Sequence, residues 1–107
     1  MKRVFICSPF AGDTERNIRI ARRLCKLEIE AGNTPFAPHL IFPQVLDDAD
    51  PNSRDIGIAC GLAYLAVCDE ILVYAGHGIS SGMRRELTYA LTHGILMRWI
   101  DKPLEVE

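Results

Sequence analysis

Four short, mostly apolar runs punctuate this chain of 107 residues, at positions 4–7, 34–37, 71–75 and 95–100. Short apolar runs of this kind are typical of strands that are covered on both faces. Longer stretches with helical spacing of apolar residues lie between them, so strands and helices alternate. This order predicts a flavodoxin- or Rossmann-like α/β fold of three layers: a parallel sheet of four to five strands with helices on both faces.

The ends of the predicted helices can be read from capping residues. The first helix begins at Asp13 or Thr14, both good N-caps, and ends before Gly32. We expect the second helix over 53–67 and the third after Ser80. The buried stripe of the first helix is expected to consist of Ile18, Ala21, Cys25 and Ile29.

The second predicted helix has two almost opposite apolar faces. One face consists of Ile56, Cys60, Ala63 and Val67, and the other of Ile58, Leu62 and Leu65. A helix that is apolar all round is either buried on all sides or part of a subunit interface. A chain of this length cannot bury both faces of an outer helix, so we expect a homodimer or higher homo-oligomer through helix 53–67. The alternative is that the C-terminal tail covers the second face.

Composition narrows the range of partners. The net charge is −2, whereas general nucleic-acid binders are usually basic, so no nucleic-acid partner is expected. No apolar stretch approaches the roughly 20 residues of a membrane span, so no membrane partner is expected either. The four cysteines form no C-x-x-C pair, which favours a reduced, cytoplasmic protein. Nothing in the spacing of His and Cys predicts a metal, and no cofactor is expected for this single domain of residues 1–107.

In a parallel sheet of this type, ligands bind at the carboxyl ends of the strands. The loops that meet there are 8–13, 38–48 and 76–82. A helix N-terminus with two hydroxyls and a glycine, as at 80–82, offers free N–H groups and a positive dipole to an anion or sugar. The acidic segment 47–50 could bind a cation or ribose hydroxyls, but a solvated turn is its default interpretation. The candidate binding residues are Ser8, Pro9, Phe10, Gly12, His39, Gly76, Ser80, Ser81 and Gly82.

Glu86 is the candidate catalytic residue. It lies one turn into the third helix, on the shoulder of the apolar stripe. Partial burial there would raise the pKa of its carboxyl group. The functional interpretation is a nucleophile or base acting at an anomeric carbon. The structural alternative is a carboxylate paired with Arg85 or with a neighbouring subunit.

Several segments together resemble the nucleoside 2-deoxyribosyltransferase-like superfamily, near its 2'-deoxynucleoside 5'-monophosphate N-hydrolases. The resemblance spans nearly the whole chain and rests on Ile6-Cys7-Ser8-Pro9-Phe10-Ala11-Gly12, Asn17, Ala21, Ala37-Pro38-His39, Cys68-Asp69 and above all Ser80-x-Gly82-x-x-x-Glu86. It implies that the serine and glycine hold a 5'-phosphate and that Glu86 is the nucleophile. The implied reaction is a retaining, two-step cleavage of an N-glycosidic bond.

Two positions depart from the acid–base set of that superfamily. Phe5 stands where the characterised enzymes have a tyrosine, and Gly61 stands where they have an aspartate. Asp55 could replace the aspartate if the second helix were shifted. Asp47 or Asp48 could replace it if the long connection folded inward.

A third departure concerns charge, because Ala11 replaces the loop arginine of the N-hydrolases.

The leading hypothesis is hydrolysis or transfer at the N-glycosidic bond of a nucleoside or nucleoside 5'-monophosphate through a glutamate nucleophile. One alternative is a non-catalytic protein that binds or senses a nucleotide-like ligand with the same pocket. Another is a purely structural oligomer.

Overall fold

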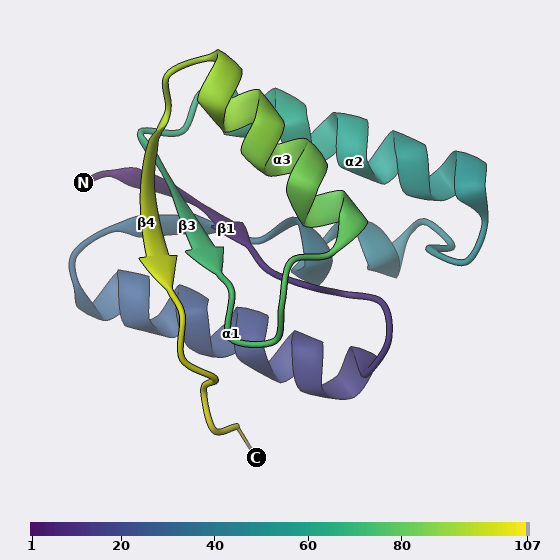
Figure 1. Cartoon of the computed structure of the whole chain (residues 1–107), viewed down its shortest axis with the longest axis horizontal. Coiled ribbons are helices and arrows are strands. Elements are labelled where there is room, and N and C mark those ends of the chain that lie inside the picture. Colours follow the sequence, from purple (N-terminus) through teal and green to yellow (C-terminus); the bar gives the residue numbers. More distant parts are fainter. Residues whose placement is uncertain (107) are drawn as a thin grey trace.

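A parallel sheet of four strands in the order β2-β1-β3-β4 forms the centre of the computed structural model, which describes residues 1–106 (Figure 1). The strands are β1 (Arg3–Cys7), β2 (Thr34–Phe36), β3 (Glu70–Tyr74) and β4 (Leu96–Ile100). Three helices connect them: α1 (Thr14–Glu30), α2 (Pro51–Leu65) and α3 (Ser81–Thr92). The predicted α/β fold is therefore confirmed.

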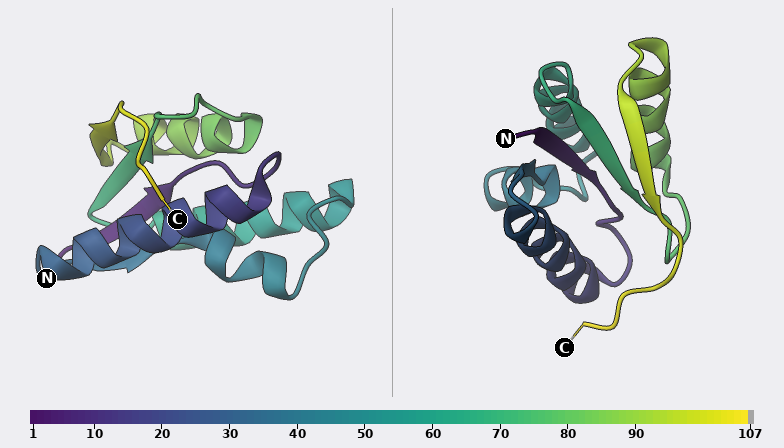
Figure 2. Two further views of the ribbon diagram at one scale, coloured as in Figure 1. Left: turned by 90° about the horizontal axis from the view of Figure 1, so that it is seen from below. Right: turned by 90° about the vertical axis from the view of Figure 1, so that its left-hand side faces the viewer.

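Alternate side chains of the strands point to opposite faces of the sheet, and each face has its own core. On one face, Val4 and Ile6 of β1 pack with residues of α1. On the other, Phe5 and Cys7 pack with residues of α2 and α3, among them Leu65. Figure 2 shows the resulting three layers, with α1 on one side of the sheet and α2 and α3 on the other. The chain changes direction across the sheet between β1 and β3, which makes their carboxyl ends the expected ligand site.

The buried stripe of α1 differs from the expected one. Ile29 is 61% exposed, and the buried residues are Asn17, Ile20, Ala21, Leu24 and Glu28. Periodicity alone places the polar residues Asn17 and Glu28 at the surface. Both are buried with a partner: Asn17 donates to the loop after β1, and Glu28 pairs with Arg98 of β4.

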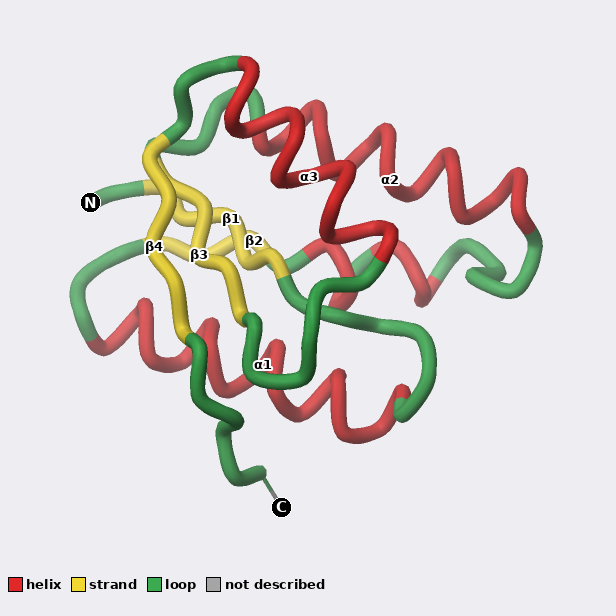
Figure 3. The backbone as a smooth tube through the Cα atoms, in the orientation of Figure 1, coloured by secondary structure: helices red, strands yellow, loops and turns green. Residues whose placement is uncertain are grey.

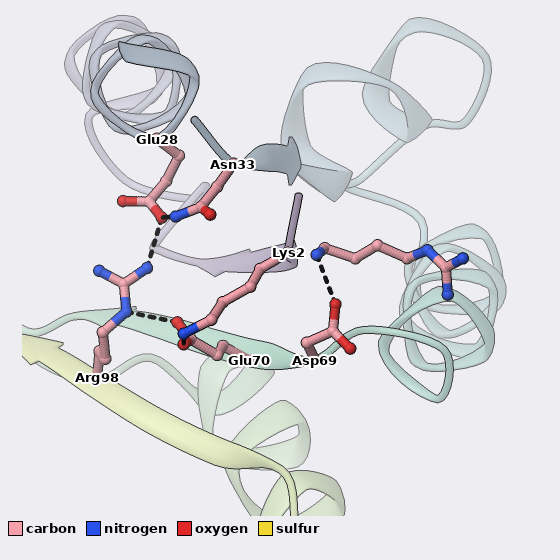
Figure 4. Close-up of polar contacts among 7 residues, drawn as sticks. Lys2, Glu28, Asn33, Asp69, Glu70 and Arg98 are labelled. Atoms are coloured by element: carbon pink, nitrogen blue, oxygen red, sulfur yellow. Dashed lines mark hydrogen bonds and ion pairs between the residues drawn. The ribbon is translucent and has the colours of Figure 1, made fainter. Parts of the chain in front are cut away.

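Ion pairs between buried carboxylates and partly exposed cations tie the elements together at the amino ends of the strands (Figure 4). Glu70, the first residue of β3, accepts from Lys2 Nζ at 2.7 Å and from Arg98 Nε at 2.6 Å. Arg98 also reaches Glu28 of α1, which in turn accepts from Asn33. The hydrogen bonds from Lys2 and Arg98 lower the pKa of Glu70. This network lies at the opposite end of the sheet from the candidate ligand loops, so its role is to hold the layers together.

Helix α2 begins and ends two residues earlier than expected, because it spans Pro51–Leu65 instead of 53–67. Asp50 is its N-cap and accepts from Ser53 N at 3.1 Å, and Pro51 occupies the first helical position. The connection before it contains two short 3-10 turns, Pro38–Leu40 and Phe42–Gln44. Within residues 1–106, no helix has the length and apolar character that crossing a bilayer requires.

The C-terminal tail runs along the α1 side of the sheet, as Figures 1 and 3 show. Leu104 and Val106 pack against the core beneath α1, and Leu104 N donates to the buried Tyr74 hydroxyl at 2.9 Å. The proposal that the tail covers α2 is therefore wrong. Apolar side chains at alternate tail positions find their partners on the nearer face of the sheet.

Candidate functional site

The side chain of Glu86 is buried at the inner face of α3. It is only 3% exposed, a deeper burial than the expected shoulder position. Its Oε1 is buried and has no hydrogen-bond partner among the described residues. Desolvation raises the pKa of this carboxyl group to about 8, opposed in part by a hydrogen bond from the Cys7 thiol. Arg85 does not neutralise it, because Arg85 Nη1 pairs instead with Asp55 Oδ1 at 2.8 Å.

Cys7, the last residue of β1, is a buried polar neighbour of Glu86. Burial, reinforced by the charge of Glu86, raises the pKa of its thiol well above the usual value. The thiol also lies 3.9 Å from the Met83 carbonyl oxygen, at the start of α3. The carboxyl group of Glu86 is thus held at the carboxyl end of β1, where the fold predicts ligand binding.

Glu86 opens on two adjoining hollows at this end of the sheet, which we call the site hollows. Both are lined by Glu86, His39, Asp48, Arg54 and Ile58. One extends along the connection between β2 and α2. The other extends to the loop after β1 and to the N-terminus of α3, where it is lined also by Phe10, Ala11, Ser80 and Gly82.

The loop after β1 is held by side chains from two other elements. Asn17 Nδ2 of α1 donates to the carbonyl oxygens of Phe10 at 2.9 Å and Ala11 at 3.2 Å. The Phe10 ring stacks on His39, with 5.3 Å between ring centroids. Burial lowers the pKa of His39, opposed by its hydrogen bond to the main chain of Ser8. The Ser8 hydroxyl is itself buried with no partner among residues 1–106.

The N-terminus of α3 supplies the opposite wall. Ser80 is the N-cap, and its hydroxyl accepts from Met83 N at 3.2 Å. Ser81 Oγ accepts from Arg54 Nη2 of α2 at 3.1 Å, which places a guanidinium beside the free N–H groups of the first turn. Gly82 lines the wall without a side chain. A helix N-terminus with an adjacent arginine suits an anionic ligand.

The structure thus brings Phe10, His39, Ser80, Gly82 and Glu86 together around the site hollows. The other candidate residues lie outside the lining of these hollows. Ser8 and Pro9 are buried behind it, and Ser81 faces a neighbouring outer hollow. Gly12 forms an exposed turn with φ +97°, which favours glycine. Gly76 is packed against the tail: a Cβ there would lie 2.8 Å from the Lys102 carbonyl oxygen.

Two charged residues, Arg54 and Asp48, also line both site hollows. Arg54 was not predicted, although its position one turn after the Asp50 cap puts it at the ligand end of the sheet. The sequence offers Asp48 as one of three candidate aspartates. The connection does fold inward at Asp48, whereas Asp47 accepts from Ala49 N at 3.0 Å in a turn and Asp55 is held outside by Arg85.

The two departures from the superfamily's acid–base set face each other. Phe5 is fully buried on β1, and Gly61 is buried in the middle of α2. A Cβ on Gly61 would lie 3.8 Å from Phe5 Cζ and 3.6 Å from Pro38 Cβ. An apolar contact therefore occupies the place of a tyrosine and an aspartate. In residues 1–106, no group of three or more His, Cys, Asp or Glu side chains is arranged to hold a metal ion.

Comparison with solved structures identifies the fold. The chain is similar to a 2-deoxyribosyltransferase from the psychrotolerant bacterium Bacillus psychrosaccharolyticus, with a TM-score of 0.75 and 14% identity over 98% of this chain and 77% of that one. It is also similar to a 2-deoxyribosyltransferase from Leishmania mexicana, with a TM-score of 0.63 and 18% identity over 94% and 64% of the two chains. The CMP N-glycosidase BcmB of Clostridium botulinum gives a TM-score of 0.57 and 20% identity over 92% and 67%.

These likenesses confirm, at the level of the fold, the resemblance to the nucleoside 2-deoxyribosyltransferase-like superfamily. No curated protein matches the chain. At the sequence level, residues 2–100 match the family described as Domain of unknown function (DUF7768). The match covers almost the whole chain, which therefore belongs to the DUF7768 family.

Proposed function

We propose that this protein cleaves, by hydrolysis or transfer, the N-glycosidic bond of a nucleoside or nucleoside 5'-monophosphate, with Glu86 as the nucleophile. The observation that carries the proposal is the buried Glu86 carboxyl, whose Oε1 has no partner among the described residues and which opens on both site hollows. A carboxyl group in this state costs stability, and groups of this kind cluster at functional sites. Fold-level similarity to two deoxyribosyltransferases and an N-glycosidase supports the same reaction class.

The reaction proceeds in two steps. In the first, a Glu86 carboxylate oxygen attacks C1' of the sugar, and the C1'–N bond breaks with its electron pair leaving on the base. In the second, water or an acceptor base attacks C1' and releases Glu86 as a carboxylate. The nucleophile must be ionised, and its pKa of about 8 means that the ionised fraction grows as the pH rises toward 8. The carboxylate stabilises the positive charge that develops at the sugar in the transition state.

The N-terminus of α3 and Arg54 would bind a 5'-phosphate. Ala11, which stands where the N-hydrolases have an arginine, lines the same hollow as Arg54. The guanidinium therefore reaches the hollow from α2 instead of from the loop after β1. Its hydrogen bond to Ser81 places it next to the first-turn N–H groups, so the two would bind one phosphate together.

The proposed function is tested by incubating the purified protein with ribo- and 2'-deoxynucleosides and their 5'-monophosphates. Free base is measured by chromatography. We expect release from at least one substrate, and faster release from a 5'-monophosphate than from the matching nucleoside. Including a second free base among the reactants distinguishes transfer from hydrolysis, because transfer yields a new nucleoside.

The same panel addresses the alternative. Thermal stabilisation by a nucleotide without base release would contradict the enzymatic proposal and indicate a binding or sensing protein. The apolar contact between Phe5 and Gly61 is the observation that favours this second candidate. Neither release nor stabilisation across the panel would contradict both.

We also propose a homodimer through the outer face of α2. Ile56 is 54% exposed and Val67 is 56% exposed, and Cys60 and Ala63 between them are exposed as well. These positions follow helical spacing, and no charged residue lies between Asp55 and Asp69. The tail lies on the other face of the sheet and leaves this surface open. A second copy of the same surface, packed about a two-fold axis, is the partner that matches it.

The dimer is tested with Ala63→Glu, which places a charge in the centre of this face. We expect the unaltered protein to have the mass of a dimer by light scattering, and Ala63→Glu to have that of a monomer with the same circular dichroism spectrum. Gln44→Glu adds the same charge at another exposed position and should remain dimeric. A monomeric unaltered protein would contradict the proposed interface.

We also propose a cytoplasmic location. All four cysteines are free, and Cys7 donates to Glu86 only as a thiol. A reducing compartment keeps that hydrogen bond intact.

A further inference from the structure

The reaction proposed above still requires a group that transfers protons. The departing base gains a proton in the first step, and the attacking water loses one in the second. In retaining glycosidases one carboxyl group performs both transfers, first as an acid and then as a base. By this precedent, the reaction of Glu86 calls for a second carboxyl group that faces the same hollows.

The middle of α2 cannot supply this group. Gly61 has no side chain, and its surroundings are the ring of Phe5 and the side chain of Pro38. Asp55, one and a half turns earlier in α2, is 68% exposed and paired with Arg85. It lines the outer hollow but neither of the site hollows.

The connection between β2 and α2 does supply a carboxyl group. Among the described residues, Asp48 is the one carboxylic acid besides Glu86 that lines both site hollows. Its neighbour Asp47 instead accepts from Ala49 N and stabilises the turn. Asp48 shares the lining with His39 and Arg54, so it faces the same space as the proposed substrate contacts.

Two anchors hold Asp48 in this position. On its N-terminal side, the connection packs directly on α2, because a Cβ on Gly57 would lie 3.5 Å from Leu46 Cδ1 and 3.8 Å from Phe42 Cβ. On its C-terminal side, Asp50 caps α2 through its hydrogen bond from Ser53 N. Only a few residues separate the anchors, so Asp48 has little freedom to leave the hollows.

We infer that Asp48 is the acid and base that completes the reaction of Glu86. This inference rests on the proposed function. In the first step, the Asp48 carboxyl gives its proton to the leaving base while Glu86 forms the ester with C1' and the C1'–N bond breaks. In the second, water attacks C1' and gives its proton to the Asp48 carboxylate, while the C1'–O bond to Glu86 breaks and its electron pair returns to Glu86. Atoms and charges balance over the cycle: the two carboxyl groups together hold one proton, which is on Asp48 when Glu86 attacks and returns to Asp48 when water attacks.

The test compares Asp48→Asn with Asp47→Asn, two neighbouring substitutions of the same chemistry. With the best substrate of the panel, we expect Asp48→Asn to lower kcat about 10²–10⁴-fold, the usual contribution of an acid–base group. Asp47→Asn retains an oxygen that accepts from Ala49 N and should stay within about threefold of the unaltered protein. Both variants should unfold at the temperature of the unaltered protein.

Azide distinguishes an acid–base role from a structural one. Azide attacks C1' without losing a proton, and a 7-methylated purine leaves without gaining one. With such a nucleotide and added azide, we expect Asp48→Asn to regain turnover and to form a glycosyl azide. Equal activity of the two asparagine variants, or loss without recovery in azide, would overturn the inference while leaving Glu86 chemistry in place. An unaltered protein that releases no base from any substrate would overturn the proposed function itself, and this inference with it.

Discussion

Glu86→Gln is expected to lower kcat/KM for base release by at least about 10³-fold, because an amide cannot form the ester with C1'. Glutamine matches the size of glutamate, so the buried packing around position 86 is kept. The measurement is base release from the best substrate, followed by chromatography under single-turnover and steady-state conditions. Intact-protein mass should show a sugar adduct on the unaltered protein and none on Glu86→Gln.

Binding is the control for this result. The walls of the site hollows come from other residues, among them Arg54 and Ser80, so Glu86→Gln should still be stabilised thermally by the substrate's 5'-monophosphate. Glu15→Gln, at an exposed position in the first turn of α1, removes the same charge from a residue outside the lining of the hollows and should leave turnover unchanged. Base release by Glu86→Gln at the rate of the unaltered protein would contradict the assigned nucleophile.

The stability of the unaltered protein is expected to contain a component that falls as the pH rises from about 5 to 8, and Glu86→Gln should lack it. Burial raises the pKa of Glu86 from 4.5 to about 8, so the folded protein binds this proton more tightly than the unfolded chain. The stabilisation is full below pH 4.5 and is lost as the pH rises to about 8. By linkage this loss is on the order of several kcal/mol.

Chemical denaturation between pH 5 and 9 measures the effect as the difference between the unaltered protein and Glu86→Gln. The difference removes the contributions of other groups that titrate. The titratable and charged groups that face Glu86 are Cys7 from β1, His39 and Asp48 from the connection, and Arg54 from α2. The pKa of His39 is lowered by burial, so its contribution has the opposite sign and is lost as the pH falls. Parallel stability curves for the two proteins would contradict a buried, proton-binding Glu86.

Capping residues and periodicity predict most helices and strands of this fold, but they did not predict the start of α2 correctly. Asp13, one of the two residues expected to cap α1, and Ser80, at the expected start of α3, both cap their helices by accepting from an N–H group within the first turn. Asp50 was missed as a cap because three aspartates precede α2 and each is a plausible turn or cap residue. Pro51 was the deciding signal, since proline is favoured at the first position of a helix.

Long-range partners explain the errors on α1. Apolar periodicity predicted a stripe through Ile29, whereas Glu28 is buried because Arg98 pairs with it from 70 positions further along the chain. Asn17 is buried because it binds a loop. No local pattern indicates that a charged residue will meet a partner on the last strand.

The sequence predicts only part of the candidate site, because some of its residues are also positioned by long-range packing. Glu86 and the N-terminus of α3 follow from one helix and its cap, so the sequence alone points to them. The positions of Asp48 and Arg54 depend instead on how the connection packs on Gly57 of α2. That packing is tertiary, so three aspartates remained equivalent until the structure separated them.

The contact between Phe5 and Gly61 makes these two positions epistatic. A Phe5→Tyr change alone would bury a hydroxyl against a glycine, and Gly61→Asp alone would bury a carboxylate against a phenyl ring, each at a cost in stability. Together, the two new groups would lie close enough to bind each other. A route between this chain and one with tyrosine and aspartate at these positions therefore passes through a less stable single variant. A library of single substitutions would discard both changes, and only a paired library would retain them.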